Sequence, residues 1–277
     1  MHRARAATGW LAGAWRDLAD LVLPSGCAGC GTSGEGGAYG VCARCVATLE
    51  HLVPAPARPT PAPAGLPPTT SLDGYDGVLR EVLLAYKERG RHGLAAPLGG
   101  LLADVVAAAV VTTGQRPASP VVLVPVPSTA RAVRARHGDH LVRLASAAAG
   151  RLRRAGWPAV VRRPLRAAAR PDSATLGGAA RAASAAGAFR VRPHRLAPLR
   201  ESAQYGTVVL LDDVITTGAT LAAVTETLTR VGVPVAAAAV LAATRRRLPP
   251  SRAGGEPRDP DTGMSRMGVG TPTPRDA

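Results

Sequence analysis

Two adjacent carboxylates, Asp212 and Asp213, follow a run of apolar residues in the last third of the chain. A short segment of small and hydroxyl-bearing residues comes next, and it contains Thr216, Thr217, Gly218, Ala219 and Thr220. Carboxylates at the end of a strand can accept hydrogen bonds from vicinal hydroxyls, and small residues let backbone N–H groups approach a phosphate. A helix that begins at such a loop adds the positive end of its dipole. The stretch therefore predicts a site for a sugar phosphate.

The four cysteines form a second group with chemical potential. Cys27 and Cys30 make one CxxC pair, and Cys42 and Cys45 make another. Two such pairs can close a tetrahedral zinc site, and all four positions are then filled by thiolates. Two disulfides or a redox-active pair are the alternatives, but a cytoplasmic chain rarely keeps disulfides. We therefore predict a structural zinc site, with His51 as a neighbour and not a ligand.

The composition suggests a globular protein with a basic surface. The chain has 277 residues, of which 46% are hydrophobic and 3% aromatic, so the core must consist of Ala, Val and Leu. The formal net charge is +15, and all but one of the 34 basic residues are Arg. These Arg are dispersed, which favours a solvated basic surface, although a polyanion-binding surface remains the alternative. The one lysine, Lys87, hints at chemistry that needs a compact ammonium group.

The N-terminal segment predicts an amphipathic helix over residues 1–24. Arg16, Asp17 and Asp20 interrupt any apolar core of a signal peptide, so packing on the domain is favoured over a membrane anchor. We identify no run with the length and composition of a membrane span, and we expect a cytoplasmic protein without one.

The order of the elements predicts the fold class. Helices are expected over residues 79–86, 94–111, 140–155 and 219–231, and strands over 121–126, 158–161, 208–211 and 233–242. Alternating strands and helices indicate an α/β protein with a parallel sheet, whose ligands bind beyond the carboxyl ends of the strands. We divide the chain into an N-terminal helix and cysteine module (1–50), a proline-rich linker (51–70), a main domain (71–247) and a disordered tail (248–277).

Residues 208–220 resemble the motif with which type I phosphoribosyltransferases bind 5-phosphoribosyl-1-pyrophosphate (PRPP). The order of several further segments is similar to that of the ComF/GntX-like branch, named for competence-associated proteins. These segments are the two cysteine pairs, Tyr86-Lys87-Glu88-Arg89-Gly90, Val124-Pro125-Val126-Pro127, an arginine-rich loop and Gly187-Ala188-Phe189. The resemblance covers about residues 18–245. It implies a phosphoribosyltransferase-like parallel sheet flanked by helices, with a small N-terminal zinc module of four cysteines.

The resemblance also implies roles for individual residues. Asp212 and Asp213 would hold the ribose 2′- and 3′-hydroxyls, and residues 216–220 would hold the 5′-phosphate. Ser128 and the nearby backbone, with Arg131, Arg134 or Arg136, would face the pyrophosphate, and Mg²⁺ would bridge pyrophosphate and ribose oxygens. Lys87 would lie in a hood over the site, formed by about residues 71–95. The candidate catalytic residues are Asp212, Asp213 and Lys87.

Two segments depart from the pattern of that family. The family usually shows Arg-Gly-Phe-Asn-Gln or Arg-Gly-His-Asp-His after the proline strand, whereas this chain has Arg136-His137-Gly138-Asp139-His140. If the glycine supplies a tight turn at the pyrophosphate, the turn is shifted or lost. The second departure is around Asp172 to Leu176, where the family usually has a Gln. This segment is expected to form a flap that has lost polar groups.

These features leave two functions open. The first is an enzyme that transfers the phosphoribosyl group of PRPP to an unidentified acceptor and releases pyrophosphate. The second is a non-catalytic PRPP sensor or adaptor in which the cysteine module or the basic surface binds DNA or a DNA-processing protein. The Asp-Asp-Thr-Thr-Gly segment and Lys87 fit both functions, and the altered loop and the net charge of +15 favour the second.

Overall fold

The computed structural model describes residues 26–33, 37–114, 119–168 and 187–244. The helices of these residues are α2 (Ala43–Glu50), α3 (Gly77–Glu88), α4 (Ala95–Thr112), α5 (Ala130–Ala135), α6 (His140–Arg154), α8 (Pro193–Tyr205) and α9 (Ala219–Thr229), with 3-10 turns η1 (Ala38–Gly40) and η2 (His92–Leu94). The strands are β1 (Ala55–Pro56), β2 (Thr69–Gly74), β3 (Val121–Pro125), β4 (Ala159–Val161), β5 (Leu165–Ala167), β6 (Phe189–Val191), β7 (Thr207–Ile215) and β8 (Ala237–Ala243). The expected helix over residues 1–24, the flap and the tail lie outside the described residues.

Six strands form the main sheet, in the order β1-β2-β8-β7-β3-β4. Across the sheet, the pairs β2–β8, β8–β7, β7–β3 and β3–β4 are all parallel, and β1 pairs antiparallel with β2 at one edge. The strands β3 and β8 are nearly continuous runs of buried residues, as expected for a parallel sheet covered on both faces. A second, two-stranded antiparallel sheet consists of β5 and β6. The predicted α/β fold with a parallel sheet flanked by helices is therefore confirmed.

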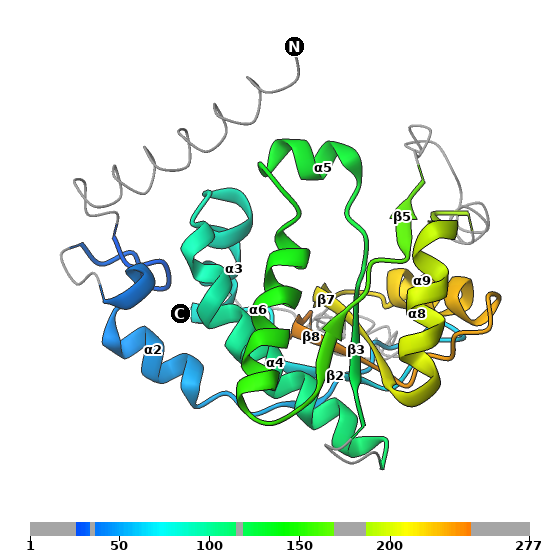
Figure 1. The fold of residues 1–277 in the computed structure, drawn as a ribbon. Coiled ribbons are helices and arrows are strands. Elements are labelled where there is room, and N and C mark those ends of the chain that lie inside the picture. Colours follow the sequence, from blue (N-terminus) through cyan, green and yellow to red (C-terminus); the bar gives the residue numbers. More distant parts are fainter. Residues whose placement is uncertain (1–25, 34–36, 115–118, 169–186, 245–277) are drawn as a thin grey trace, which may run out of the picture. The chain divides into compact units, whose positions relative to one another are not determined.

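The handedness of the crossovers explains how the helices cover the sheet. Parallel crossovers are almost always right-handed, so connections that move in opposite directions along the sheet place their helices on opposite faces. The steps from β2 to β3 and from β3 to β4 move one way and place α4 and α6 on one face. The steps from β4 to β7 and from β7 to β8 move the other way and place α8 and α9 on the opposite face (Figure 1). The connections therefore diverge between β3 and β7, which is where ligands bind in such sheets.

The helices α4 and α6 pack closely against each other because Gly99 has no side chain. A Cβ atom at Gly99 would lie 2.4 Å from the Cβ atom of Ala147 on α6. Asp139 starts α6, and its carboxylate accepts a hydrogen bond from the Val142 backbone N–H at 3.3 Å. This N-cap determines where α6 begins, and it makes His140 the first residue of the helix.

One helical segment of the described residues, His92–Thr112, is long and apolar enough to cross a membrane, with a mean hydropathy of 2.0. The prediction that no run reaches this length is therefore wrong by length and composition. Half of the segment is buried inside the structure, and α4 packs on β2, β8 and α6. These contacts are those of a core helix, because an apolar helix on a sheet passes the same test.

Several elements were absent from the sequence-based expectation. Strand β2 is one, because its residues apart from Leu72 are small or polar, although most of the strand is buried. Strand β1 lies inside the predicted proline-rich linker, and its Pro56 is compatible with a strand because β1 is at the edge of the sheet. The helices α5 and α8 were also missed, since both carry dispersed arginines without a clear apolar stripe.

Candidate functional site

Asp212 and Asp213 lie in β7 near its carboxyl end, where β7 continues further than the apolar run suggested. The pairing of β3 with β7 stops at Pro125 and Leu211, whereas the pairing of β7 with β8 continues to Ile215 and Ala243. The two carboxylates therefore follow the last residue that β3 pairs with. Their strand is open on the β3 side, at the point where the connections diverge.

The Asp213 carboxylate contacts two side chains from different helices. Its Oδ2 atom lies 2.7 Å from Lys87 Nζ, at the end of α3, and 2.7 Å from His140 Nε2, at the start of α6. The three side chains are largely buried, with exposed fractions of 13% for Lys87, 8% for His140 and 12% for Asp213. Because an ionised carboxylate only accepts hydrogen bonds, His140 donates from Nε2. The structure thus brings the predicted Lys87 and Asp213 together, and it adds His140.

These contacts determine the charge of Asp213. Burial by itself would raise the pKa of this carboxyl, but the hydrogen bond from His140 and the charge of Lys87 lower the pKa to about 2. Asp213 is therefore a permanent carboxylate near neutral pH. Its Oδ2 atom is engaged by the protein, which leaves Oδ1 as the oxygen that can face a ligand.

Asp212 has the opposite electrostatic environment. Burial and the negative charge of Asp213 raise the pKa of Asp212 to about 7, and the hydrogen bond that it accepts from the Asp213 backbone N–H, at 2.9 Å, reduces this shift. Two neighbouring carboxylates with separated pKa values are typical of sites that bind or react with a ligand. Two hydroxyl groups that donate hydrogen bonds to Asp212 would offset the cost of desolvating its carboxylate without adding a charge.

Residues 216–220 comprise the loop that connects β7 with α9 and the first two residues of α9. Gly218 has φ +76° and precedes the first residue of α9, and a backbone in this left-handed region favours glycine. Four of the five residues are exposed, and Thr217 Oγ1 accepts a hydrogen bond from the Ala219 backbone N–H at 3.4 Å. The loop and the N-terminus of α9 can therefore present N–H groups to an anion.

The proline-rich segment before β2 packs under this loop. A Cβ atom at Gly218 would lie 3.1 Å from both terminal carbons of Leu66 and 3.5 Å from Pro59 Cγ. Leu66 is itself buried. The segment therefore fixes the loop from one side, a function that the composition of a linker did not indicate.

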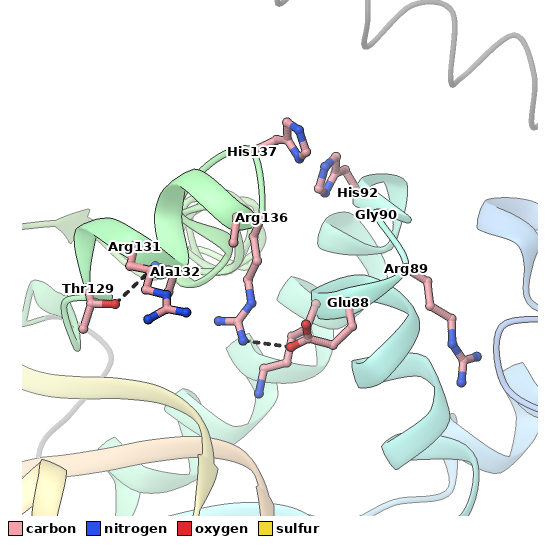
Figure 2. A pocket seen from close by; sticks show the side chains of 11 residues that line it. Glu88, Arg89, Gly90, His92, Thr129, Arg131, Ala132, Arg136 and His137 are labelled. Carbon is pink, nitrogen blue, oxygen red and sulfur yellow. Dashed lines mark hydrogen bonds and ion pairs between the residues drawn. The ribbon is translucent and has the colours of Figure 1, made fainter. Parts of the chain in front are cut away.

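Ser128 and the following residues form the second part of the site. Ser128 Oγ donates a hydrogen bond to Asp139 Oδ1 at 3.4 Å, and Thr129 caps α5 by accepting from the Ala132 backbone N–H at 3.2 Å. A cavity of about 530 Å³ lies between α5 and the end of α3. Figure 2 shows Arg131 and Arg136 on the α5 side of this cavity and Glu88 on the α3 side. The cavity is lined by Lys87, Glu88, Arg89, Gly90, His92, Thr129, Arg131, Ala132, Ala135, Arg136 and His137.

The turn after α5 shows how the chain accommodates its unusual sequence. His137 has φ +52°, so it adopts the left-handed conformation although it is not glycine, and Gly138 has φ +140°. The Gly138 backbone N–H donates to the Val133 carbonyl at 2.9 Å, and Arg143 donates to the His137 carbonyl at 2.8 Å. The tight turn is therefore present at the position where the resemblance expects glycine. The expectation of a shifted or lost turn is wrong, because these hydrogen bonds hold His137 in a conformation that is costly for it.

The four cysteines converge as the spacing predicts. Their Sγ atoms lie within 4.8 Å of one another, and Cys30 Sγ is 3.8 Å from Cys42 Sγ. This distance agrees with the edge of a tetrahedron whose zinc–sulfur bonds are about 2.3 Å long. Cys27 Sγ also accepts from the backbone N–H groups of Gly29 and Cys42, at 3.4 and 3.2 Å. None of the four is in a disulfide, so the cluster could hold a metal ion.

The cysteine module is joined to α3. Arg91 donates from Nη1 to the Gly26 carbonyl at 2.9 Å, and its guanidinium fills the space beside Gly40 where a side chain would lie. Gly29 similarly leaves room for Cys45 and for Val78 of α3. His51 is outside the cluster, since its Nδ1 lies 2.6 Å from the Ala47 carbonyl, in agreement with its predicted role as a neighbour.

Sequence reasoning missed three residues of the site or treated them only as neighbours. The sequence assigned no role to His140, although it contacts Asp213, and its proximity to Lys87 could not be read from positions so far apart in the sequence. Glu88 and Arg91 gave no signal beyond their closeness to Lys87 along the chain. Tyr86 is buried in the core, and its hydroxyl donates to the His140 carbonyl at 2.7 Å.

The comparisons with known proteins agree with this site. Residues 142–255 match the family model described as the phosphoribosyl transferase domain. The matched part includes most of α6, together with β7, the two carboxylates and residues 216–220, whereas Lys87, Arg136, His140 and the cysteines precede it. No curated protein matches the chain. The match supports the resemblance to type I phosphoribosyltransferases for the part of the chain that carries the two carboxylates and residues 216–220.

Proposed function

We propose that this protein binds PRPP and transfers its phosphoribosyl group to an acceptor, with release of pyrophosphate. The observation that supports this proposal most is the placement of Asp212 and Asp213 where the sheet connections diverge, followed at once by the glycine-containing start of α9. In this reading the carboxylates accept hydrogen bonds from the ribose 2′- and 3′-hydroxyls. The loop of residues 216–220 binds the 5′-phosphate.

The chemistry follows from the charges of these residues. When pyrophosphate leaves C1′, positive charge develops on the sugar ring and negative charge on the leaving group. The fixed carboxylate of Asp213 favours the first, and Arg131, Arg136 and Lys87 favour the second. Mg²⁺ would enter with PRPP as part of the substrate and neutralise its phosphate oxygens; it needs one or two carboxylates and phosphate oxygens, which this site provides.

We assign Lys87 a second role in addition to its expected place in the hood. Its ammonium contacts Asp213, so it holds the carboxylate as well as facing the cavity. Zinc in the cysteine cluster would be structural, since all four positions are thiolates. The cluster would then fix Arg91 and the end of α3, and through α3 the position of Lys87.

A second candidate function is a PRPP sensor or adaptor without turnover, in a protein of the cytoplasm that works with DNA-handling machinery such as that of competence. The cationic cavity and the separate cysteine module favour it, because either could bind a DNA phosphate or a protein partner. The resemblance to the ComF/GntX-like branch supports both candidates.

Turnover distinguishes the two candidates. Pyrophosphate release from PRPP and Mg²⁺ is measured with free bases, nucleoside precursors and nucleic acids as acceptors, and compared with the Asp212→Asn and Asp213→Asn variants. Acceptor-dependent release that both variants lose supports the enzyme. Binding of PRPP without release for any acceptor contradicts the enzyme and supports the sensor. A protein that binds no PRPP contradicts both.

A further inference from the structure

One carboxylate stands among the cations of the cavity between α3 and α5. The lining includes Lys87, Arg89, Arg131 and Arg136, with His92 and His137, and Glu88 is the acidic residue among the described residues that line it. Glu88 Oε1 lies 2.8 Å from Arg136 Nη2. Figure 2 shows this ion pair as a link between the α3 side and the α5 side of the cavity.

The backbone on both sides of the pair is held in place. Glu88 is the last residue of α3, directly after Lys87, which contacts Asp213 at 2.7 Å. Arg136 is the residue directly after α5, and its backbone N–H donates to the Ala132 carbonyl at 3.0 Å, just before the hydrogen-bonded turn at His137. Because both backbones are fixed, the Arg136 guanidinium and the Glu88 carboxylate lie within reach of each other across the cavity.

We propose that Glu88 acts as a resident anion that competes with the pyrophosphate group of the ligand for Arg136. This inference rests on the proposed function and adds a residue that sets the affinity of its site. The ligand delivers a diphosphate to Arg136, and the Glu88 carboxylate moves into solvent, to which 54% of its side chain is already exposed. A ligand that lacks a pyrophosphate group does not use Arg136, and its affinity does not depend on Glu88.

The exposure of the pair sets the size of the effect. An exposed ion pair contributes at most about 1 kcal/mol, which corresponds to a factor of about five in a dissociation constant. Removal of the Glu88 charge should therefore raise the affinity for pyrophosphate and for PRPP by about two- to fivefold. The affinity for ribose 5-phosphate, which would bind at the 216–220 loop, should stay unchanged.

The test measures dissociation constants calorimetrically at one ionic strength with Mg²⁺, for PRPP, inorganic pyrophosphate and ribose 5-phosphate. The wild-type protein is compared with Glu88→Gln and Glu88→Ala. Glu226→Gln is the matched control, since Glu226 lies on α9, is 57% exposed and pairs with Arg230. An Arg136→Ala variant, alone and with Glu88→Gln, tests whether the gain depends on Arg136.

The expected result is a gain for PRPP and pyrophosphate in both Glu88 variants, no gain with Glu226→Gln, and no gain once Arg136 is absent. A loss of affinity in Glu88→Gln would overturn the proposal, because Glu88 would then position Arg136 for the ligand. Equal affinities, or an equal gain for ribose 5-phosphate, would also overturn it, the second as a general effect of charge. If the variants give any of these overturning results while the wild-type protein binds PRPP, the proposal for Glu88 fails and the proposed function stands. A wild-type protein that binds none of the three ligands overturns both proposals.

Discussion

Replacement of Lys87 by methionine should destabilise the protein, because it removes one of the two partners of a buried carboxylate. The pKa of Asp213 falls from its ordinary 3.8 to about 2 in the folded protein. At 1.36 kcal/mol for each pKa unit, this difference corresponds to about 2 kcal/mol of net stabilisation, because Lys87 and His140 together outweigh the cost of burying the carboxylate. Without Lys87 the burial of Asp213 dominates, and loss of one partner of a buried pair costs up to about 5 kcal/mol. We expect Lys87→Met to lower the free energy of unfolding at pH 7 by roughly 2–4 kcal/mol.

The pH dependence gives a second signature of the same contact. Because the folded pKa of Asp213 is depressed, its stabilising contribution is fully present above about pH 4 and is lost as the pH falls toward 2. The difference in stability between the wild-type protein and Lys87→Met should therefore be largest near neutral pH and shrink below pH 4. Urea denaturation followed by circular dichroism between pH 3 and 7 measures this difference.

A double-mutant cycle separates the ion pair from other effects of the substitution. Asp213→Asn alone leaves the Lys87 ammonium buried without its carboxylate, whereas Lys87→Met with Asp213→Asn removes both charges. The double variant should lose less stability than the two single variants added together, by about 1–3 kcal/mol. If the effects of the two single variants add within about 0.5 kcal/mol, or if Lys87→Met is as stable as the wild type, then Lys87 does not stabilise the Asp213 carboxylate.

Three further predictions concern the rest of the site. Burial raises the pKa of Asp212 to about 7, so this carboxyl destabilises the folded protein increasingly as the pH rises from about 4 through 7. Asp212→Asn should therefore stabilise the protein at pH 8 by roughly 1–2 kcal/mol but not at pH 4, as measured by urea denaturation. Equal stability of variant and wild type at pH 8 would contradict the assigned pKa. Metal analysis should find about one Zn²⁺ per chain, and a Cys27→Ser, Cys45→Ser variant should lose it, whereas a metal-free wild-type protein with free thiols would rule out the zinc site. Gly218→Ala should weaken the binding of ribose 5-phosphate about tenfold or more in calorimetry, since φ +76° disfavours a side chain and an added Cβ atom would lie 3.1 Å from Leu66. Unchanged binding would show that this loop does not hold the phosphate.

The parts of the fold that the sequence predicted have strong local patterns. The apolar runs of β3, β7 and β8 and the periodic helices α4, α6 and α9 are visible in the residues themselves. Strand β2 was missed because its stability comes from pairing with β8, and small polar residues suffice for a strand that its neighbours cover. Strand β1 was missed because prolines predict a linker, although an edge strand tolerates them.

The candidate site was predictable where its residues are contiguous. Asp212, Asp213 and residues 216–220 lie in one stretch, and the four cysteines have a spacing that identifies them. The contacts of Asp213 with Lys87 and His140 depend on the packing of α3 and α6 on one face of the sheet. The left-handed His137 shows the same limit, since the turn is fixed by hydrogen bonds from Gly138 and Arg143 and not by the residue type.

A crystal structure of the protein with PRPP and Mg²⁺ would show whether the two carboxylates hold the ribose. We expect the ribose hydroxyls on Asp212 and on Oδ1 of Asp213, the 5′-phosphate on residues 216–220 and the pyrophosphate beside Arg136. We also expect Lys87 to remain near Asp213 and Glu88 to have released Arg136. PRPP bound away from the two carboxylates, or no PRPP bound at concentrations that saturate a phosphoribosyltransferase, would contradict this assignment of the site.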